Sequence, residues 1–273
     1  MAFLVREPSG AATPLVVEVP HAGLALDAPA LATLVAPAFS LARDADLYVD
    51  ELFQDAPHEG ATLITAQASR YLVDLNRSEA DVDAMAVEGA SGRTTPHGLV
   101  WRATTEGRPA LSAPLTHREL ERRLSTYYRP YHAELARLLE IRVARFGFAL
   151  LLCAHSMPSR GRDGHSDTGR ARADVVPGSR GRTSADAVVI DTVDRVAREA
   201  GFSIAHDQPY RGGFSTAHYG RPERGVHAVQ VELSRRLYMN ELTLERRARE
   251  FPQLREFCRD LVRQLGAVRP HTR

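Results

Sequence analysis

Apolar residues along the chain gather in short runs that end in polar residues, as in strands buried inside a sheet. One run, F-A-L-L-L-C-A-H-S-M-P-S at residues 148–159, predicts a strand covered on both faces with His155 near its carboxyl end. A shorter run, L-V-V-E-V at residues 15–19, ends at a proline and is followed by His21. Because ligands of open α/β sheets bind at the carboxyl edge of the strands, the two histidines could share a ligand.

Other segments predict helices and further strands in alternation. Strand patterns occur at residues 61–66, 69–77, 203–207 and 226–233, and helical patterns at residues 40–53, 116–146, 183–200 and 243–265. Pro130 lies inside the second helical stretch, which therefore either kinks or divides into two helices. The alternation predicts an α/β fold with a layered, at least partly parallel sheet.

Three stretches have loop-like compositions. Residues 24–40 contain two prolines and are expected to form a loop. Residues 78–115 are too long for a plain connection, so we expect an ordered functional loop or a lid, with a possible strand at residues 97–102. Residues 159–182 are rich in Gly and Arg and predict a mobile basic loop.

Composition narrows the class of protein. The chain of 273 residues is 44% apolar and 25% charged, and its formal net charge of +1 argues against a dedicated nucleic-acid binder. It contains no apolar window of about eighteen residues, as a membrane span needs. The N-terminus lacks the basic and apolar regions of an export signal, so we expect a cytoplasmic protein. Cys153 and Cys258 lie in a predicted strand and a predicted helix, which argues against a disulfide framework.

One feature of the composition bears on substrate binding. All 35 basic residues are Arg, which base composition of the source genome can explain. The consequence is that cationic contacts to a substrate would come from guanidinium groups, which suit bidentate capture of carboxylates.

The two histidines at strand ends point to a metal. A lone histidine in such a place is more often a hydrogen-bonded structural residue, but His21 and His155 are accompanied by an acidic segment that contains Asp44 and Asp46. Two histidines and one carboxylate with an open position form a catalytic zinc pattern. The compact H-E-x-x-H motif is absent, so spacing alone does not choose between the two aspartates.

Further polar residues are candidates for catalysis and substrate binding. Glu232 lies in the apolar run V-Q-V-E-L, where burial would raise its pKa and favour a general base, and Glu18 is a rival of the same kind. Either carboxylate could instead be paired with an arginine at the sheet edge. Candidates for binding an anionic substrate are Arg70, Asn76, Arg77 and Arg211; the alternative for each is solvated surface.

Several motifs together resemble the N-formylglutamate amidohydrolase family. They are P-H-A-G at residues 20–23, R-D-A-D-L-Y-V-D-E-L at 43–52, S-R-Y-L-V-D-L-N-R at 69–77, H-S-M-P-S at 155–159, and the run from P-Y-R-G-G at 209–213 to L-Y-M-N-E at 237–241. The motifs occur in the family's order and cover residues 14–265. The resemblance implies a single domain of this family over residues 1–273. It also implies a mixed central sheet flanked by helices, similar to the phosphorylase/hydrolase-like fold of zinc carboxypeptidases and aspartoacylases.

The resemblance implies an activity and a set of metal ligands. The implied enzyme is a zinc-dependent amidohydrolase that cleaves N-formyl-L-glutamate to formate and L-glutamate in histidine degradation, with one zinc ion or another divalent metal. Aspartoacylase-like enzymes have Glu three residues after their first histidine, where this chain has Leu24, so the carboxylate ligand must come from elsewhere. The implied ligands are His21, Asp46 and His155, with Asp44 in reserve.

Catalytic and substrate-binding roles follow from the same resemblance. Glu232 would act as base and then as acid. The run D-L-N-R at residues 74–77 is similar to the run that grips the substrate carboxylate in aspartoacylase-like enzymes, which assigns Asn76 and Arg77 to the substrate. Arg70 and Arg211 are expected to assist them.

Two departures from the family leave other functions open. Deformylases of the family have an acidic residue where this chain has Cys153, and a run similar to G-D-R-x-G-x-S-C where this chain has G-S-R-G-R-T-S-A at residues 178–185. The substrate could therefore be another N-acyl amino acid or a peptide amide of the cell wall. A further alternative is a binding module that recognises a small anion without hydrolysing it.

Overall fold

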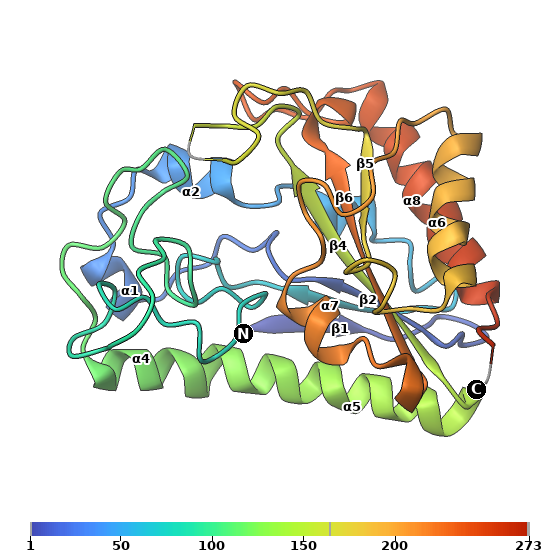
Figure 1. The fold of residues 1–273 in the computed structure, drawn as a ribbon, viewed down its shortest axis with the longest axis horizontal. Helices are drawn as coiled ribbons and strands as arrows, with labels where there is room; N and C mark the ends of the chain where they lie inside the picture. The colour runs from blue at the N-terminus through green and yellow to red at the C-terminus, as the bar shows by residue number, and fades with distance from the viewer. Residues whose placement is uncertain (1, 164, 272–273) are drawn as a thin grey trace.

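The centre of the protein is a six-stranded sheet, described here in a computed structural model that covers residues 2–163 and 165–271. Its order is β1-β3-β2-β4-β6-β5, of which β2, β4, β6 and β5 can be followed in Figure 1. The four central strands are parallel, and the edge strands β1 and β5 are antiparallel to their neighbours. The strands are β1 (Phe3–Arg6), β2 (Leu15–Val19), β3 (Thr62–Ala66), β4 (Ala149–Met157), β5 (Val175–Gly178) and β6 (Val226–Ser234). This confirms the predicted α/β fold with a mixed sheet flanked by helices.

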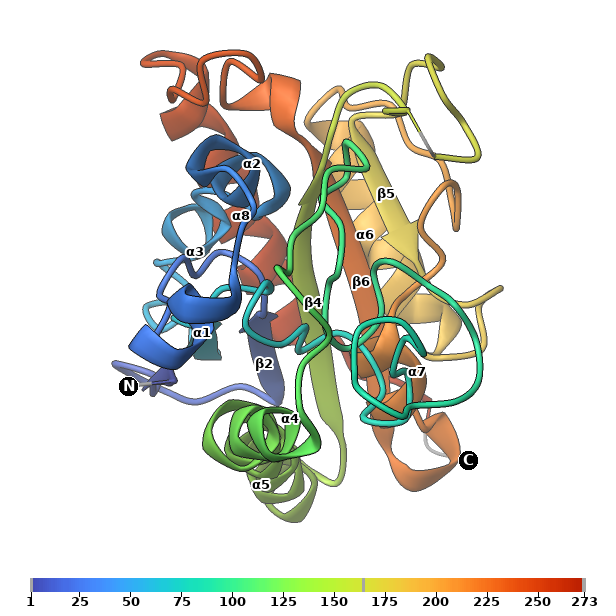
Figure 2. The ribbon, with the colours of Figure 1, turned by 90° about the vertical axis from the view of Figure 1, so that its left-hand side faces the viewer.

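Helices cover both faces of the sheet (Figures 1 and 2). One face packs against α5 (Arg129–Phe146), and the other packs against α3 (Val49–Leu52), α6 (Ala187–Glu199) and α8 (Glu250–Ala267). Alternate residues of each strand point to opposite faces, so each strand contributes to both cores. The other α-helices are α1 (Ala28–Thr33), α2 (Ala38–Asp44), α4 (His117–Arg123) and α7 (Phe214–Tyr219), and short 3₁₀ turns cover Pro222–Arg224 and Arg235–Leu237. Within the described residues, the helices are too short or too polar to cross a membrane.

The long predicted helix at residues 116–146 is continuous but changes its winding. A π-helical turn at Leu124–Tyr128 joins α4 to α5. Pro130 follows directly as the second residue of α5, and the wider turn before it lets the helix continue past a residue that has no N–H to donate. The wider turn therefore connects two helical segments without an intervening loop.

Strand β4 is the element that brings the candidate chemistry together. It is buried along its whole length and pairs with β2 on one side and β6 on the other. The register places His155 directly beside Glu232 of β6 and Cys153 beside Glu18 of β2. His21 follows the end of β2 by two residues. The parallel direction of the three strands thus delivers His21, His155 and Glu232 to one edge of the sheet.

Some predicted strands are wrong. Residues 69–77 form turns, with Leu72 N–H donating to Ser69 O and Arg77 N–H donating to Asp74 O. The segment is buried from Tyr71 to Asn76 but does not pair with a strand. Its alternation of residue types therefore does not reflect a position in a sheet. Residues 97–102 and 203–207 make only isolated bridges.

Several other boundaries also differ from the prediction. The loop predicted at 24–40 contains α1, whose N-cap Asp27 accepts from Ala30 N–H, and the basic loop at 159–182 contains β5. The last helix begins at Glu250, seven residues after the predicted start at Thr243. Neither α7 at residues 214–219 nor β1 was predicted.

The helix predicted at 40–53 is interrupted. α2 ends at Asp44 and α3 begins at Val49, and Tyr48 between them has a left-handed backbone with φ of 68°. In the break, Asp46 N–H donates to His21 O at 3.0 Å. This contact with the end of β2 replaces helical bonding and turns Asp46 toward the sheet edge.

Leu152→Ala should test the central position of β4. Leu152 has no exposed surface and lies in the core shared with α6 and α8, so the substitution should lower the free energy of unfolding by about 2–5 kcal/mol. Leu242→Ala is the matched control because that side chain is 85% exposed and should change it by less than about 0.5 kcal/mol. Urea denaturation followed by circular dichroism measures both, and equal losses would contradict the assignment of Leu152 to the core.

Candidate functional site

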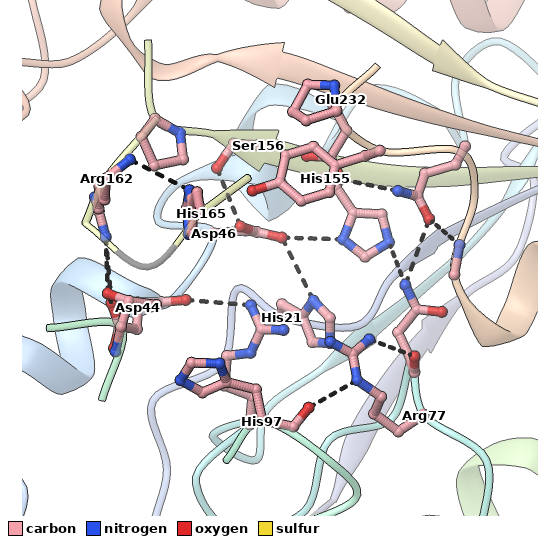
Figure 3. A pocket seen from close by; sticks show the side chains of 18 of the residues that line it. His21, Asp44, Asp46, Arg77, His97, His155, Ser156, Arg162, His165 and Glu232 are labelled. Carbon is pink, nitrogen blue, oxygen red and sulfur yellow. Dashed lines mark hydrogen bonds and ion pairs between the residues drawn. The ribbon is translucent and has the colours of Figure 1, made fainter. Parts of the chain in front are cut away.

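Two histidines and one aspartate converge at the carboxyl edge of the sheet (Figure 3). His155 Nδ1 lies 3.0 Å from Asp46 Oδ2, and His21 Nδ1 lies 3.6 Å from the same oxygen. The centres of the imidazole rings are 5.0 Å apart. All three side chains are buried, and one possible ligand atom from each lies within 4.8 Å of the others. The structure therefore brings together the three residues that the sequence analysis singled out.

The second oxygen of Asp46 is held by groups that the sequence analysis did not identify. Ser156 Oγ–H donates to Asp46 Oδ1 at 3.2 Å, and Arg235 donates to it at 3.1 Å. Burial alone would raise the pKa of Asp46, but its contacts with His155 and His21 outweigh burial and hold the pKa well below its usual range. Asp46 is therefore ionised, with Oδ2 directed toward the two imidazoles.

A second aspartate orients His21 from behind. Asp74 Oδ1 lies 2.8 Å from His21 Nε2, while Asp74 Oδ2 accepts from Arg70 and from the indole N–H of Trp101. Burial opposes ionisation of Asp74, but its interactions with His21, Arg70 and Arg77 lower its pKa well below the usual value. An ionised carboxylate only accepts, so His21 Nε2 carries a proton and a neutral ring leaves Nδ1 free to bind a metal.

The donor set fits zinc. Two imidazole nitrogens and one carboxylate oxygen are typical protein ligands of a catalytic zinc ion, which keeps a further position for water or substrate. An outer carboxylate on a ligating histidine, such as Asp74 on His21, is a regular companion of such sites. The chemistry of the residues present thus agrees with a metal centre, although other divalent ions accept the same donors.

Asp44 belongs to a different cluster. Its carboxylate accepts from Tyr71 OH at 2.6 Å, from the backbone and hydroxyl of Thr105, and from Arg162 at 3.2 Å. These contacts tie α2 to the long loop at 78–115 and to the basic loop at 159–182. Asp46, and not the reserve candidate Asp44, lies with the two histidines.

Glu232 lies beside the three converging residues. It is 5% exposed and stands next to His155 in the register of β4 and β6. Its Oε1 accepts from Gln230 Nε2 at 2.8 Å, and no other described side chain donates to the carboxylate. Burial raises the pKa of Glu232 to about 7, a value suited to a group that takes up and returns a proton near neutral pH.

These residues line a cavity of about 370 Å³ with many guanidinium groups in its wall. The arginines are Arg70, Arg77, Arg162, Arg211 and Arg235. The first, third and fifth are paired with Asp74, Asp44 and Asp46, respectively. The nearest carboxylate to Arg77 is that of Asp81, at 3.9 Å, and Arg211 has no carboxylate partner among the described residues. Two cationic groups thus remain available to an anionic substrate.

The amide of Asn76 is engaged at both ends. Its Oδ1 accepts from Ser215 N–H at 3.0 Å. Its Nδ2 lies 3.2 Å from His155 Nε2 and 3.4 Å from Gln230 Oε1. Asn76 therefore touches the candidate metal centre, and its predicted contact with a substrate carboxylate stays a prediction.

Four residues of the site were missed by the sequence analysis in these positions. They are Asp74, Ser156, Gln230 and Arg235. Ser156 and Arg235 lie at the ends of β4 and β6, where a polar residue after an apolar run is a usable signal, and Gln230 interrupts the apolar run in the middle of β6. The contact of Arg235 with Asp46 joins residues 189 apart in the chain, and no local pattern indicates it.

The fold and the site together fit an enzyme with a mixed α/β sheet and a candidate metal centre at the carboxyl ends of its parallel strands. The model of the family described as N-formylglutamate amidohydrolase matches residues 13–239. The chain belongs to this family.

Two curated relatives and one solved structure support this assignment. The N-formylglutamate deformylase of Pseudomonas putida is 36% identical over 231 residues, which cover 84% of this chain and 82% of the relative. The protein of that name from Pseudomonas aeruginosa is 35% identical, with coverages of 84% and 83%. A crystal structure of an N-formylglutamate amidohydrolase from Ralstonia eutropha JMP134 superposes with a TM-score of 0.90 at 33% identity and covers 97% of both chains.

Substitution of the two neighbouring aspartates should distinguish their roles. Asp46→Asn should weaken zinc binding by at least about tenfold because it removes the negative charge that faces both histidines. Asp44→Asn should leave zinc affinity unchanged while loosening the contacts with Tyr71, Thr105 and Arg162. Competition with a chelator measures the affinity of each variant. Loss of zinc from the Asp44 variant alone would contradict the assignment.

Proposed function

We propose that the protein is a zinc-dependent amidohydrolase that cleaves N-formyl-L-glutamate to formate and L-glutamate, a reaction of histidine degradation. The proposal rests on membership of the family and on one observation above all. Glu232, a buried carboxylate, lies beside His155 in a cavity where Arg77 and Arg211 remain available to bind an anion. A hydrolytic site for an acyl amino acid needs this combination of a proton acceptor and anion-binding groups.

The metal ligands in this proposal are His21, Asp46 and His155. A zinc ion held there would act as a Lewis acid toward the acyl carbonyl and lower the pKa of a water molecule to near neutrality. Asp74 keeps His21 in the required tautomer, and Arg235 keeps Asp46 in its orientation.

Glu232 carries the proton in this mechanism. Its carboxylate takes a proton from the attacking water and then delivers it to the nitrogen of the departing L-glutamate. Gln230 fixes one carboxylate oxygen through its amide, so the other is free to make the transfer. Burial raises the pKa of Glu232 to about 7, which makes both directions of transfer accessible near neutral pH.

The arginines hold the substrate. Arg77 donates to His97 O through Nε and to Asn76 O, which fixes its side chain at the cavity wall. Arg211 is exposed and lies next to two glycines. We assign the two carboxylates of the substrate to these two residues. Arg70 and Asn76 also line the cavity, and Arg70 acts mainly by holding Asp74.

Glu232→Gln tests the mechanism. The amide keeps the size of the side chain but cannot accept the proton, so formate release should fall by about 10²–10⁴-fold while zinc remains bound. Glu223→Gln, at an exposed position outside the cavity, is the control and should keep full activity. Formate is measured with a coupled assay and zinc by elemental analysis. Unchanged turnover in the Glu232 variant would remove it from the mechanism.

Arg211→Gln tests the substrate assignment. Loss of a charge-assisted contact should raise KM for N-formyl-L-glutamate by about 10–100-fold. Arg224→Gln is the control because Arg224 is exposed and does not line this cavity. The same assay with other N-acyl amino acids separates a deformylase from a relative with a different substrate. Faster turnover of a neutral acyl amino acid would contradict the proposed substrate.

A further inference from the structure

A second carboxyl group is buried close to the site and has no part in the mechanism above. Glu18 lies in β2 between Val17 and Val19, and none of its surface is exposed. Its Oε1 accepts from Ser215 Oγ–H at 2.8 Å and from Tyr131 OH at 3.1 Å, while its Oε2 has no partner among the described residues. Burying such a group costs several kcal/mol in the absence of full compensation, so its presence in an apolar strand calls for a reason.

The contacts of Glu18 lead to the candidate metal centre through Ser215. Ser215 uses its hydroxyl for Glu18 and its backbone N–H for Asn76 Oδ1, at 3.0 Å. The other end of the Asn76 amide lies 3.2 Å from His155 Nε2. Glu18 and the His155 ring are therefore connected through Ser215 and Asn76 by three polar contacts of 2.8, 3.0 and 3.2 Å.

The N-terminus of α7 encloses Asn76 closely. A Cβ atom added to Gly213 would lie 2.3 Å from Asn76 Nδ2, so only glycine allows this approach. Gly213 N–H donates to Gln230 Oε1 at 2.9 Å, and Gln230 in turn donates to Glu232. The position of the first turn of α7 thus bears on the orientation of both Asn76 and Gln230.

We propose that Glu18 is a positioning residue, which anchors the first turn of α7 through Ser215 and so holds the Asn76 amide against His155. Tyr131, on α5, contributes to the burial of Glu18 but has no contact with Asn76. The inference rests on the proposed function for its activity measurement, and zinc affinity provides a measurement that is independent of the substrate.

The variants follow from the direction of each contact. Glu18→Leu removes the hydrogen-bond acceptor and places an apolar side chain in the buried strand. Glu18→Gln keeps an acceptor oxygen at Oε1 and should therefore retain function. Ser215→Ala removes the hydroxyl alone. Tyr131→Phe is the matched control because it removes the other hydrogen bond to the same oxygen and leaves the route to Asn76 intact.

Asn76 Nδ2 can only donate, so its contact with His155 Nε2 bears on which ring nitrogen carries the proton. Glu18→Leu and Ser215→Ala should therefore each shift the dissociation constant of zinc, and lower kcat for N-formyl-L-glutamate, by about 10–100-fold. Their effects should be non-additive in the double variant because both act through one contact. Glu18→Gln and Tyr131→Phe should stay close to the unchanged protein in both measurements. Thermal denaturation of all variants separates these effects from general loss of stability.

Two outcomes would overturn the inference. One is unchanged zinc affinity in folded Glu18→Leu and Ser215→Ala proteins, and the other is an equal loss in Tyr131→Phe. Absence of hydrolysis by the unsubstituted, zinc-loaded protein would instead refute the proposed function, and the zinc measurements would still decide the role of Glu18.

Discussion

The geometry of the site depends on the negative charge of Asp46, which is withdrawn from water and must be matched by surrounding donors. A carboxylate buried without partners costs several kcal/mol, so the residues around it are strongly constrained. Its contacts come from separate segments: His21 after β2, His155 and Ser156 in β4, and Arg235 directly after β6. Only the neighbouring, parallel arrangement of β2, β4 and β6 brings these segments to one point. The sheet order and the chemistry of the site are therefore two aspects of one constraint.

The same constraint explains where sequence patterns succeed and where they fail. Continuous apolar runs identify β2 and β4 because parallel strands covered on both faces have no polar side. The prediction of one helix at 40–53 was wrong because the hydrogen bond from Asp46 N–H to His21 O interrupts it. The spacing of residues within the segment does not indicate that distant partner. Residues 69–77 fail for a related reason. Most of these residues are buried beside the site without pairing with a strand, so their alternation of residue types has another origin.

Within the site, the residues that line the cavity were easier to predict from the sequence than the residues that hold them in place. His21, His155 and Glu232 each follow or interrupt an apolar run, and Asp46 was chosen through family motifs. The supporting contact of Arg235 with Asp46 spans 189 residues and requires the folded chain to be recognised. Outer residues of this kind have no characteristic spacing, because their partners are set by how strands are ordered in the sheet.

The long segment at 78–115, expected to be a functional loop or a lid, contributes fixed contacts to the site. Trp101 donates its indole N–H to Asp74, and Thr105 donates to Asp44, so two buried carboxylates rely on this segment for hydrogen bonds. If the segment moved away from the site, both buried carboxylates would lose hydrogen-bond donors, which costs free energy. This cost favours a segment that stays in place over a lid that opens and closes. Natural variation should then be tolerated at its exposed tip, residues 91–94, while a change of the indole would be transmitted through Asp74 to the first histidine.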